Sequence, residues 1–419
     1  MSGIMNIISD FKRECPCGVK HETAIRDVRV GKGLVNKVGE ILIENNFPEK
    51  ILLVTDKNAL KASRGITENL KGFEIEYKIY DDMRIAKLEN TEEIVDLIKG
   101  KNVGVLSVGS GSVNDPCRYA AALCDKPLCI FATAPSMDGF ASYGAPLVNH
   151  EGFKYSYPAK SPEIIIGDTE ILAAAPVHLK SAGFGDMISK YTALVDWQIS
   201  ALLTDEIYCE RVAALTRKAI DDLMGLADKV TTNDPDTAGK IFESLLLTGI
   251  GMSFTQNSRP ASGAEHIIAH LIDCKEIAEG KMPNFHGEDV GVCTLEILKI
   301  YNALAKYETV KARRETVDFD DVYRYYGNMG DDVRALNTPD TITDYVNPDD
   351  IADNWQKIRD IIHSVPSFED CRAAMEKAGC KVTVQDIGKK QDFFDECVKY
   401  SPYMRRRLTL LRMINMIEV

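Results

Sequence analysis

Three side chains, Asp186, His266 and His286, are of the types that bind a divalent metal ion. One aspartate with two histidines is the mixed oxygen and nitrogen donor set that suits zinc, iron or nickel, and it leaves coordination positions open for a substrate oxygen. His270 lies four positions after His266, so the two share one face of a helix, one turn apart. The sequence therefore predicts a metal site built from these three side chains.

A cation held by these three residues would act as a Lewis acid. It would polarise a carbonyl oxygen, and in the reverse direction it would lower the pKa of an alcohol so that the alkoxide can expel a hydride. His270 would then hydrogen-bond the substrate or relay its proton. Because Asp186 precedes a helix expected over Met187–Ile199, a helix-capping role for this carboxylate is the structural alternative.

A glycine- and serine-rich turn in the first half could bind the phosphates of a dinucleotide. It runs over Gly109–Asp115, directly after an expected strand and before a helix expected over Pro116–Cys124. Glycine lets a backbone approach a pyrophosphate closely, and the N-terminus of a helix favours an anion. The turn does not have the G-x-G-x-x-G pattern, so a purely structural connection between strand and helix stays open.

Two more segments supply polar side chains at the ends of expected strands. Asp56 follows a strand expected over Ile51–Thr55, where it could accept hydrogen bonds from an adenosine ribose or cap the next helix. The segment Thr133–Ser142 follows a strand expected over Leu128–Ala132 and contains hydroxyls, a glycine and Asp138. Turn formation explains its proline and glycine. It does not explain so many small polar side chains, which indicate a binding site.

The first part of the chain shows the pattern of a parallel sheet with crossover helices, because short β-branched runs alternate with amphipathic stretches. The helix over Thr91–Lys99 is expected to start with Asn90 and Glu93 at capping-box spacing. Another helix is expected over Leu34–Asn45. Strands are expected over Asp27–Val30, Ile51–Thr55, Glu76–Tyr80, Val103–Val108, Leu128–Ala132 and Ile164–Ile166.

From about Leu172 onward the strand patterns end and long helical periodicities begin. We therefore expect an α/β dinucleotide-binding domain over residues 1–171 and an all-α domain that binds metal and substrate over residues 172–419. A cleft between two such domains is a common place for a ligand. The main helices are expected over Arg211–Val230, Lys240–Phe254, Ala264–Cys274 and Asp289–Tyr307.

Composition excludes several classes of protein. The formal net charge of −13 argues against a broad surface for nucleic acid or for an anionic membrane. No apolar run is long enough to span a bilayer, and the N-terminal residues lack the layout of a cleavable signal. We expect a cytoplasmic protein with no membrane insertion, whose partner is a small molecule.

The eleven cysteines form no regular framework, which indicates reduced thiols rather than disulfides. Cys15, Cys17 and His21 could bind a structural zinc ion. Their C-x-C spacing is tighter than zinc sites usually have, and the sequence offers no evident fourth ligand. A tight turn with packed thiols is therefore the favoured interpretation.

Taken together, these motifs resemble the iron-containing alcohol dehydrogenase superfamily, which has a Rossmann-like parallel-sheet α/β domain followed by an all-α domain, the dehydroquinate synthase-like architecture. Within it, the chain is similar to the branch that reversibly reduces dihydroxyacetone phosphate to sn-glycerol 1-phosphate, usually as a cytoplasmic homodimer. The resemblance extends from Val28 to beyond Leu298. Its most specific motifs are GSGSVND at 109–115, TAPSMDGFAS at 133–142, GFGD at 183–186, SGAEH at 262–266 and HG at 286–287.

The resemblance implies NAD(H) or NADP(H) and one divalent ion, zinc, nickel or iron, as cofactors. It implies substrate contacts by Asp138 and His270, and metal binding by Asp186, His266 and His286, of which His286 is aligned most loosely. An acid at Asp56 disfavours the extra phosphate of NADP, whereas the neighbouring Lys57 could offset that repulsion. The nucleotide contacts implied are Asp56, Gly111, Ser112, Val113, Asn114, Asp115, Thr133, Ala134, Pro135, Ser136 and Ser142.

Three alternatives remain open. A glycerol or other polyol dehydrogenase of the same superfamily would lack a phosphate site, and a 3-dehydroquinate synthase would need a denser set of basic side chains. A non-catalytic protein that binds nucleotide and metal would have no need of Asp138 and His270 beside a complete set of ligands. A cluster of cations in the cleft would favour a phosphorylated substrate, with Lys154, Lys160, Arg259 and Lys281 as candidates.

Overall fold

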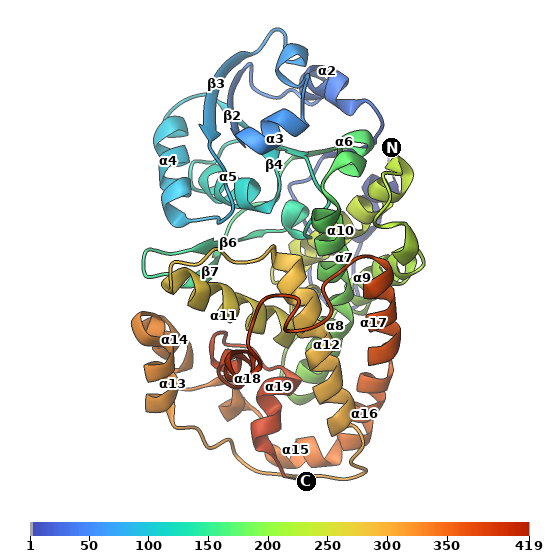
Figure 1. The fold of residues 1–419 in the computed structure, drawn as a ribbon, viewed down its shortest axis with the longest axis vertical. Coiled ribbons are helices and arrows are strands. Elements are labelled where there is room, and N and C mark those ends of the chain that lie inside the picture. Colours follow the sequence, from blue (N-terminus) through green and yellow to red (C-terminus); the bar gives the residue numbers. More distant parts are fainter. Residues whose placement is uncertain (1–2, 419) are drawn as a thin grey trace.

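The computed structural model describes residues 3–418, with a sheet and its helices in one part and a helical bundle in the other (Figure 1). Six parallel strands pair in the order β1-β8-β5-β4-β2-β3. All six strands expected from the sequence are confirmed, with ends shifted by at most two residues. They are β1 (Asp27–Gly31), β2 (Lys50–Asp56), β3 (Glu74–Tyr80), β4 (Gly104–Gly109), β5 (Leu128–Ala132) and β8 (Ile164–Asp168).

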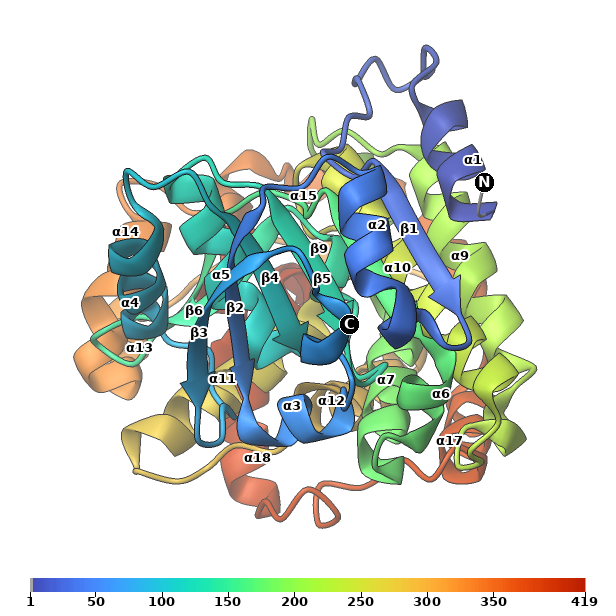
Figure 2. The same ribbon diagram turned by 90° about the horizontal axis from the view of Figure 1, so that it is seen from above.

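Helices cover both faces of this sheet, as Figure 2 shows from above. The central strands β4, β5 and β8 are buried along their whole length, which explains their nearly continuous apolar sequences. Neighbouring residues of β2 point to opposite faces of the sheet. Leu53 packs in one core cluster with Leu42 of α2 (Val38–Glu44). Leu52 packs in another core cluster with Ile94 of α4 (Leu88–Ile98). The helices α3 (Lys57–Ala62) and α5 (Gly111–Leu123) complete the crossovers.

Several helix starts differ from the expectation, two of them at α2 and α4. The helix expected from Leu34 begins as a 3-10 turn, and α2 starts at Val38. Helix α4 starts at Leu88, because Asn90 accepts a hydrogen bond from the backbone N–H of Lys87 at 3.1 Å. Glu93 pairs with Lys78 and Tyr80 instead of closing a capping box, so that part of the prediction is wrong.

The second half is helical, as expected, apart from the two-residue strands β9 (Lys311–Ala312) and β10 (Ile417–Glu418), which pair antiparallel. The helices near the sheet and the site are α6 (Thr169–Ala174), α7 (Val177–Ile188), α8 (Lys190–Leu203), α9 (Glu210–Met224), α10 (Pro235–Thr255), α11 (Ala264–Ala278) and α12 (His286–Leu304). Shorter helices follow: α13 (Phe319–Tyr326), α14 (Gly330–Asn337), α15 (Pro348–Asp353), α16 (Trp355–His363), α17 (Phe368–Lys377), α18 (Gln391–Tyr400) and α19 (Leu410–Met413).

Two features had no counterpart in the sequence-based expectation. Helix α1 (Gly3–Phe11) buries Ile4, Ile8 and Phe11 in the core cluster that α10 also joins. The strands β6 (Gly144–Val148) and β7 (Lys154–Pro158) form an antiparallel hairpin, which lies beside the helical bundle in Figure 1. The hairpin brings Lys154 to the boundary between the two parts.

Helix α10 joins the sheet to the bundle. Phe242 of α10 packs on Gly167 of β8 so closely that a Cβ atom at Gly167 would lie 2.4 Å from the aromatic ring. One core cluster therefore contains Ile130 and Ile165 of the sheet together with Leu246 of the helix. The last strand of the large sheet ends at Asp168. Because side chains of the sheet and of α10 pack in the same core cluster, the expected domain boundary between residues 171 and 172 stays a prediction.

None of the helices within residues 3–418 has both the length and the apolar character that crossing a lipid bilayer requires.

Candidate active site

A cavity of about 800 Å³ opens at the carboxyl ends of the parallel strands. The chain passes from β2 to β3 in one direction along the sheet and from β4 to β5 in the other, so the strand order reverses between β2 and β4. Ligands of open α/β sheets bind at such a reversal. Asp56 at the end of β2 and Ser110 after β4 line the cavity on this side, and His270 and His286 line it on the helical side.

Seven of the eleven residues expected to contact nucleotide line this cavity. Helix α5 starts at Gly111, five residues earlier than expected, so the glycine- and serine-rich turn forms the first turn of a helix. The free N–H groups of such a turn favour an anion. Asp56 caps α3 by accepting a hydrogen bond from Ala59 N at 2.7 Å and also lines the cavity. The seven are Asp56, Gly111, Ser112, Asp115, Thr133, Ala134 and Ser136.

The other four, Val113, Asn114, Pro135 and Ser142, are buried behind the cavity wall. Val113 belongs to the core of the sheet, and Asn114 accepts a hydrogen bond from Ser107. The carbonyl of Pro135 packs against Gly183 of α7. Ser142 donates to the carbonyl of Gly144 at 2.9 Å and accepts from a buried arginine. The structure gives these residues positions that shape the wall rather than face the cavity.

That arginine, Arg118, was not singled out by sequence reasoning. Its guanidinium is fully buried and joins the carboxylate of Asp115 to the hydroxyl and carbonyl of Ser142. Burial raises the pKa of Asp115, and the charge of Arg118 opposes that shift. Arg118 therefore fixes the loop after β5 to the helix that follows β4.

The three expected metal ligands come together. Asp186, His266 and His286 each offer one ligand atom, and these atoms lie within 4.8 Å of one another. Asp186 Oδ1 lies 3.3 Å from His266 Nε2, and the rings of His266 and His286 have centroids 5.2 Å apart. The other nitrogen of His266, Nδ1, lies 2.9 Å from the carboxylate of Glu265. Such a carboxylate orients a histidine ligand and makes it more basic.

Glycines of the GFGD and HG motifs explain how these residues converge. Asp186 lies near the end of α7, not at the start of a helix as expected, and His286 begins α12. A Cβ atom at Gly287 would lie 1.8 Å from the carbonyl oxygen of Ala182, and one at Gly185 would lie 2.4 Å from the carbonyl oxygen of Gly287. Only glycine permits this backbone contact between α7 and α12.

A buried lysine, which sequence reasoning missed, completes the polar cluster. Lys190 Nζ lies 2.6 Å from Asp186 Oδ1 and 2.7 Å from Asp138 Oδ2. Burial alone would raise the pKa of Asp186, but Lys190 and His266 hold it below its ordinary value. Burial and the charge of Asp186 raise the pKa of Asp138. The spacing of Asp186 and Lys190, four residues, was the signal available in the sequence.

His270 stacks on the metal-ligand candidate His286, next to this cluster. His270 and His286 lie with ring centroids 5.2 Å apart and planes at 15°, and within the described residues the Nδ1 atom of each is buried without a hydrogen-bond partner. Burial lowers the pKa of both imidazoles well below the ordinary value, which keeps them neutral and able to donate a lone pair to a metal. A carboxylate oxygen and unpartnered imidazole nitrogens fit a divalent cation such as zinc. His286 also lies within reach of Asp273 and His270, so this histidine is shared by two possible ligand groups.

Of the four cations considered for a phosphate, only Lys154 lines the cavity. Its Nζ lies 2.8 Å from Asp273 Oδ2, on the same side as His270. The others pair with carboxylates elsewhere: Lys160 with Glu163, Arg259 with Glu206 and Lys281 with Glu279. Lys61 and Arg84 also line the cavity.

Comparisons with known proteins agree with this geometry. Residues 29–176 match the family described as iron-containing alcohol dehydrogenase. The NADH-dependent butanol dehydrogenase A of Thermotoga maritima has the same fold, with a TM-score of 0.62 at 18% identity over 93% of this chain and 92% of that one. A probable glycerol dehydrogenase of Sinorhizobium meliloti gives a TM-score of 0.57 at 19% identity over 81% and 98%. Fold and site thus define an iron-containing alcohol dehydrogenase.

Two relatives narrow the assignment. A glycerol-1-phosphate dehydrogenase [NAD(P)+] of Halalkalibacterium halodurans is 28% identical over 96% of this chain and 95% of its own length. One of Methanothermobacter thermautotrophicus is 35% identical over 66% of this chain and 78% of its own. The chain belongs to the glycerol-1-phosphate dehydrogenase family. It is therefore an oxidoreductase of the alcohol dehydrogenase type.

Proposed function

We infer that this protein is a metal-dependent NAD(P)H oxidoreductase that reversibly reduces dihydroxyacetone phosphate to sn-glycerol 1-phosphate. The observation that carries the proposal is the convergence of Asp186, His266 and His286 within 4.8 Å of one another, with His286 on the wall of the cavity that the carboxyl ends of the strands also line. The names of the relatives supply the substrate class.

The nucleotide would lie across the reversal between β2 and β4, with its pyrophosphate against the first turn of α5. Asp56 would lie near the adenosine ribose, where its charge disfavours the additional phosphate of NADP. Lys57, the residue that could offset this charge, is already paired with Asp81 at 2.5 Å. We therefore expect NADH to be the better cofactor, which oxidation rates of NADH and NADPH measured side by side would test.

Asp186, His266 and His286 would hold one zinc, nickel or iron ion. When bound, such an ion polarises a ketone oxygen toward hydride attack. Asp138 and His270, which both line the cavity, would hydrogen-bond the hydroxyl groups of the substrate. The ammonium group of Lys190 would hold the Asp138 carboxylate in place through their ion pair. The neutral ring of His270 would hold or release a proton at Nδ1.

Lys154 would bind the phosphate of the substrate, because it lines the cavity and pairs with Asp273, which lies one turn along α11 from His270. The experiment that tests the proposal compares the rates of NADH oxidation with dihydroxyacetone phosphate and with dihydroxyacetone. The phosphorylated ketone should be reduced far faster. Equal rates would remove the phosphate from the proposed substrate.

One observation favours a second candidate, a polyol dehydrogenase without a phosphate site. The charge of Lys154 is already balanced by Asp273 at 2.8 Å, so it is less available to a phosphate than a free lysine would be. Faster oxidation of glycerol than of sn-glycerol 1-phosphate would support this candidate. The expected homodimer and the cytoplasmic location stay predictions, and light scattering of the purified protein tests the first.

A further inference from the structure

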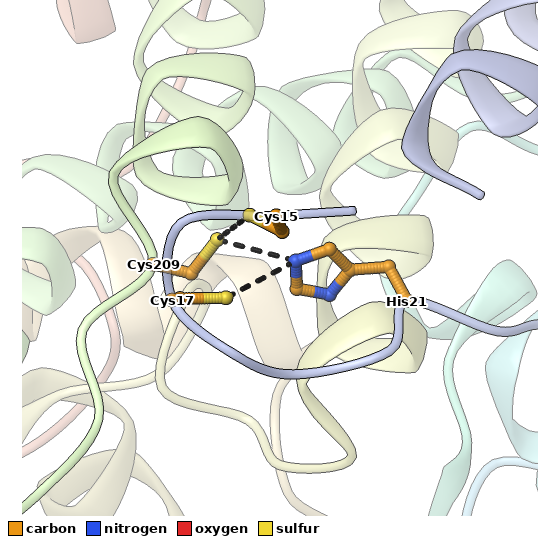
Figure 3. A group of neighbouring side chains, drawn as sticks. All are labelled: Cys15, Cys17, His21 and Cys209. Carbon is orange, nitrogen blue, oxygen red and sulfur yellow. Dashed lines mark hydrogen bonds between the residues drawn. The ribbon is translucent and has the colours of Figure 1, made fainter. Parts of the chain in front are cut away.

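A second group of metal-binding side chains lies outside the active site (Figure 3). Cys15, Cys17 and His21 belong to the loop after α1, and Cys209 is the residue that caps the N-terminus of α9. The turn expected from the sequence is present, since Gly18 N–H donates to the carbonyl of Cys15 at 2.9 Å. The structure adds Cys209, which lies 188 positions beyond His21 in the sequence.

The distances in this group match a tetrahedral zinc site. Zinc–sulfur bonds of about 2.3 Å and a zinc–nitrogen bond of about 2.0 Å place two sulfur atoms about 3.8 Å apart, and a sulfur and a nitrogen about 3.5 Å apart. Cys15 Sγ lies 3.7 Å from Cys209 Sγ. His21 Nε2 lies 3.4 Å from both Cys17 Sγ and Cys209 Sγ. All four ligand atoms lie within 4.8 Å of one another.

The surroundings of His21 prepare its ring to be a ligand. The ring nitrogen Nδ1 lies 3.0 Å from the carbonyl oxygen of Phe254, so Nδ1 carries the proton and donates it in this hydrogen bond. The lone pair of Nε2 then points at the sulfur atoms. The rings of Phe11 and Phe254 stack next to His21, which leaves only 2% of the histidine exposed. Water is thereby kept from this side of the group.

We propose that Cys15, Cys17, His21 and Cys209 bind a structural zinc ion. Four protein ligands fill a tetrahedral shell and leave no position for a substrate, which is the arrangement of structural rather than catalytic zinc. Binding would convert thiols to thiolates and release their protons to solvent. None of the four residues is among those that line the active-site cavity, so this ion would be separate from the catalytic one.

The ion would fasten the start of the chain to the helical part. Its ligands connect the loop after α1 to the N-terminus of α9, and the hydrogen bond from His21 reaches the last turn of α10. In the described structure α1 packs on α10 through Phe11 and Phe254, and Arg211 of α9 lies 4.5 Å from the centre of the Phe11 ring. Removing the ion should therefore loosen α1.

Cobalt(II) distinguishes this site from the catalytic one. Thiolate ligands give cobalt an intense near-ultraviolet charge-transfer band, which a site of one aspartate and two histidines does not give. We expect this band in the cobalt-loaded wild-type protein and in His266→Ala, and we expect it to be lost in Cys17→Ser and Cys209→Ser. Cys124→Ser, a half-exposed cysteine at the end of α5, is the matched control and should keep it.

Zinc content gives an independent readout that does not depend on activity. Wild-type protein purified with a thiol reductant should hold one zinc equivalent more than Cys17→Ser, and the same extra equivalent should persist in His266→Ala. Added zinc should raise the melting temperature of His266→Ala but not that of the double variant with Cys17→Ser. A cobalt-loaded His266→Ala without the charge-transfer band, or a Cys15–Cys209 disulfide in protein purified under reductant, would overturn the proposal.

Discussion

Asp186 and Lys190 face each other across the junction of α7 and α8, with Oδ1 and Nζ 2.6 Å apart and both side chains fully buried. The same ammonium group lies 2.7 Å from Asp138 Oδ2, so two buried carboxylates share one buried cation. The charges at the centre of the site are thus partly balanced by the chain itself.

Replacing this lysine should make the protein depend on metal for its stability. Lys190→Met keeps most of the length of the side chain but leaves Asp138 and Asp186 without their cation, which costs roughly 3–5 kcal/mol in a buried pair. Zinc should then stabilise the variant more than it stabilises the wild type. Urea unfolding with and without zinc measures both effects. Lys218→Met, which breaks an exposed pair with Asp222, is the control and should change neither.

Metal binding should be lost when the ligand His266 is replaced, and should weaken when its supporting carboxylate, Glu265, is replaced. His266→Ala removes one ligand, so we expect loss of the catalytic ion and a fall in turnover by orders of magnitude. Glu265→Gln removes only the charge that orients His266, and we expect metal affinity to fall about 10–100-fold. Metal titration of the apoprotein measures the metal affinity of both variants. Full metal content in His266→Ala would mean that the ligand assignment is wrong.

The contact between α7 and α12 should not tolerate a side chain. Gly287→Ala places a Cβ atom 1.8 Å from the carbonyl oxygen of Ala182, so the two helices must separate. We expect a loss of stability on the order of 3 kcal/mol and a lower metal affinity, because Asp186 and His286 move apart. Gly225→Ala is the matched control, since its nearest atom would lie 3.7 Å away. Equal stability of the two variants would contradict the packing argument.

Lys154 should affect the phosphorylated substrate only. Lys154→Ala removes a charged hydrogen bond worth roughly 1.5–3 kcal/mol, so KM for dihydroxyacetone phosphate should rise about 10–100-fold. KM for dihydroxyacetone should stay the same. Lys160→Ala, which loses a pair with Glu163 away from the cavity, should leave both constants unchanged. An equal rise of KM for both ketones would instead indicate a general role in shaping the site.

Asp289 should make stability depend on pH. Burial and the nearby charge of Asp273 raise the pKa of Asp289 from 3.8 to about 8. The folded state therefore holds this proton more tightly than the unfolded state, so the stabilisation is complete below about pH 4 and is lost as the pH rises toward 8. Asp289→Asn keeps the acceptor for Asn284 but does not titrate.

Relative to the wild type, Asp289→Asn should gain on the order of 4 kcal/mol in the free energy of unfolding between pH 5 and pH 8. Urea denaturation at the two pH values measures the difference. Asp228→Asn, at an exposed position, should show none. A constant difference between Asp289→Asn and wild type at both pH values would show that Asp289 stays ionised in the folded protein.

The positions of the strands along the chain and the helical character of the second half could be predicted from the sequence, because both depend on local periodicity. The apolar runs of β2 and β5 were found almost to the residue. Helix starts were less accurate, since each depends on which single capping hydrogen bond is made. At α4 it is the bond from Lys87 to Asn90, one turn before the expected start.

The residue types of the candidate metal site could be predicted from the sequence, but the buried side chains that surround the site could not. The histidines were singled out because three of the seven in the chain fall within 21 positions, and Asp186 because the GFGD segment precedes a helical run. Lys190 and Arg118 looked like ordinary helical residues, and only their complete burial shows that each holds carboxylates or a loop in place.

The sequence by itself determined which residue types could bind metal and nucleotide, and where the strands of the large sheet lie along the chain. Only the tertiary structure decided that these residues meet, since convergence depends on contacts between segments far apart in the chain. The backbone contact of Gly287 with Ala182 is one such contact, and the approach of Cys209 to Cys15 is another. Local patterns carry no information about these distances, because packing of the whole chain sets them.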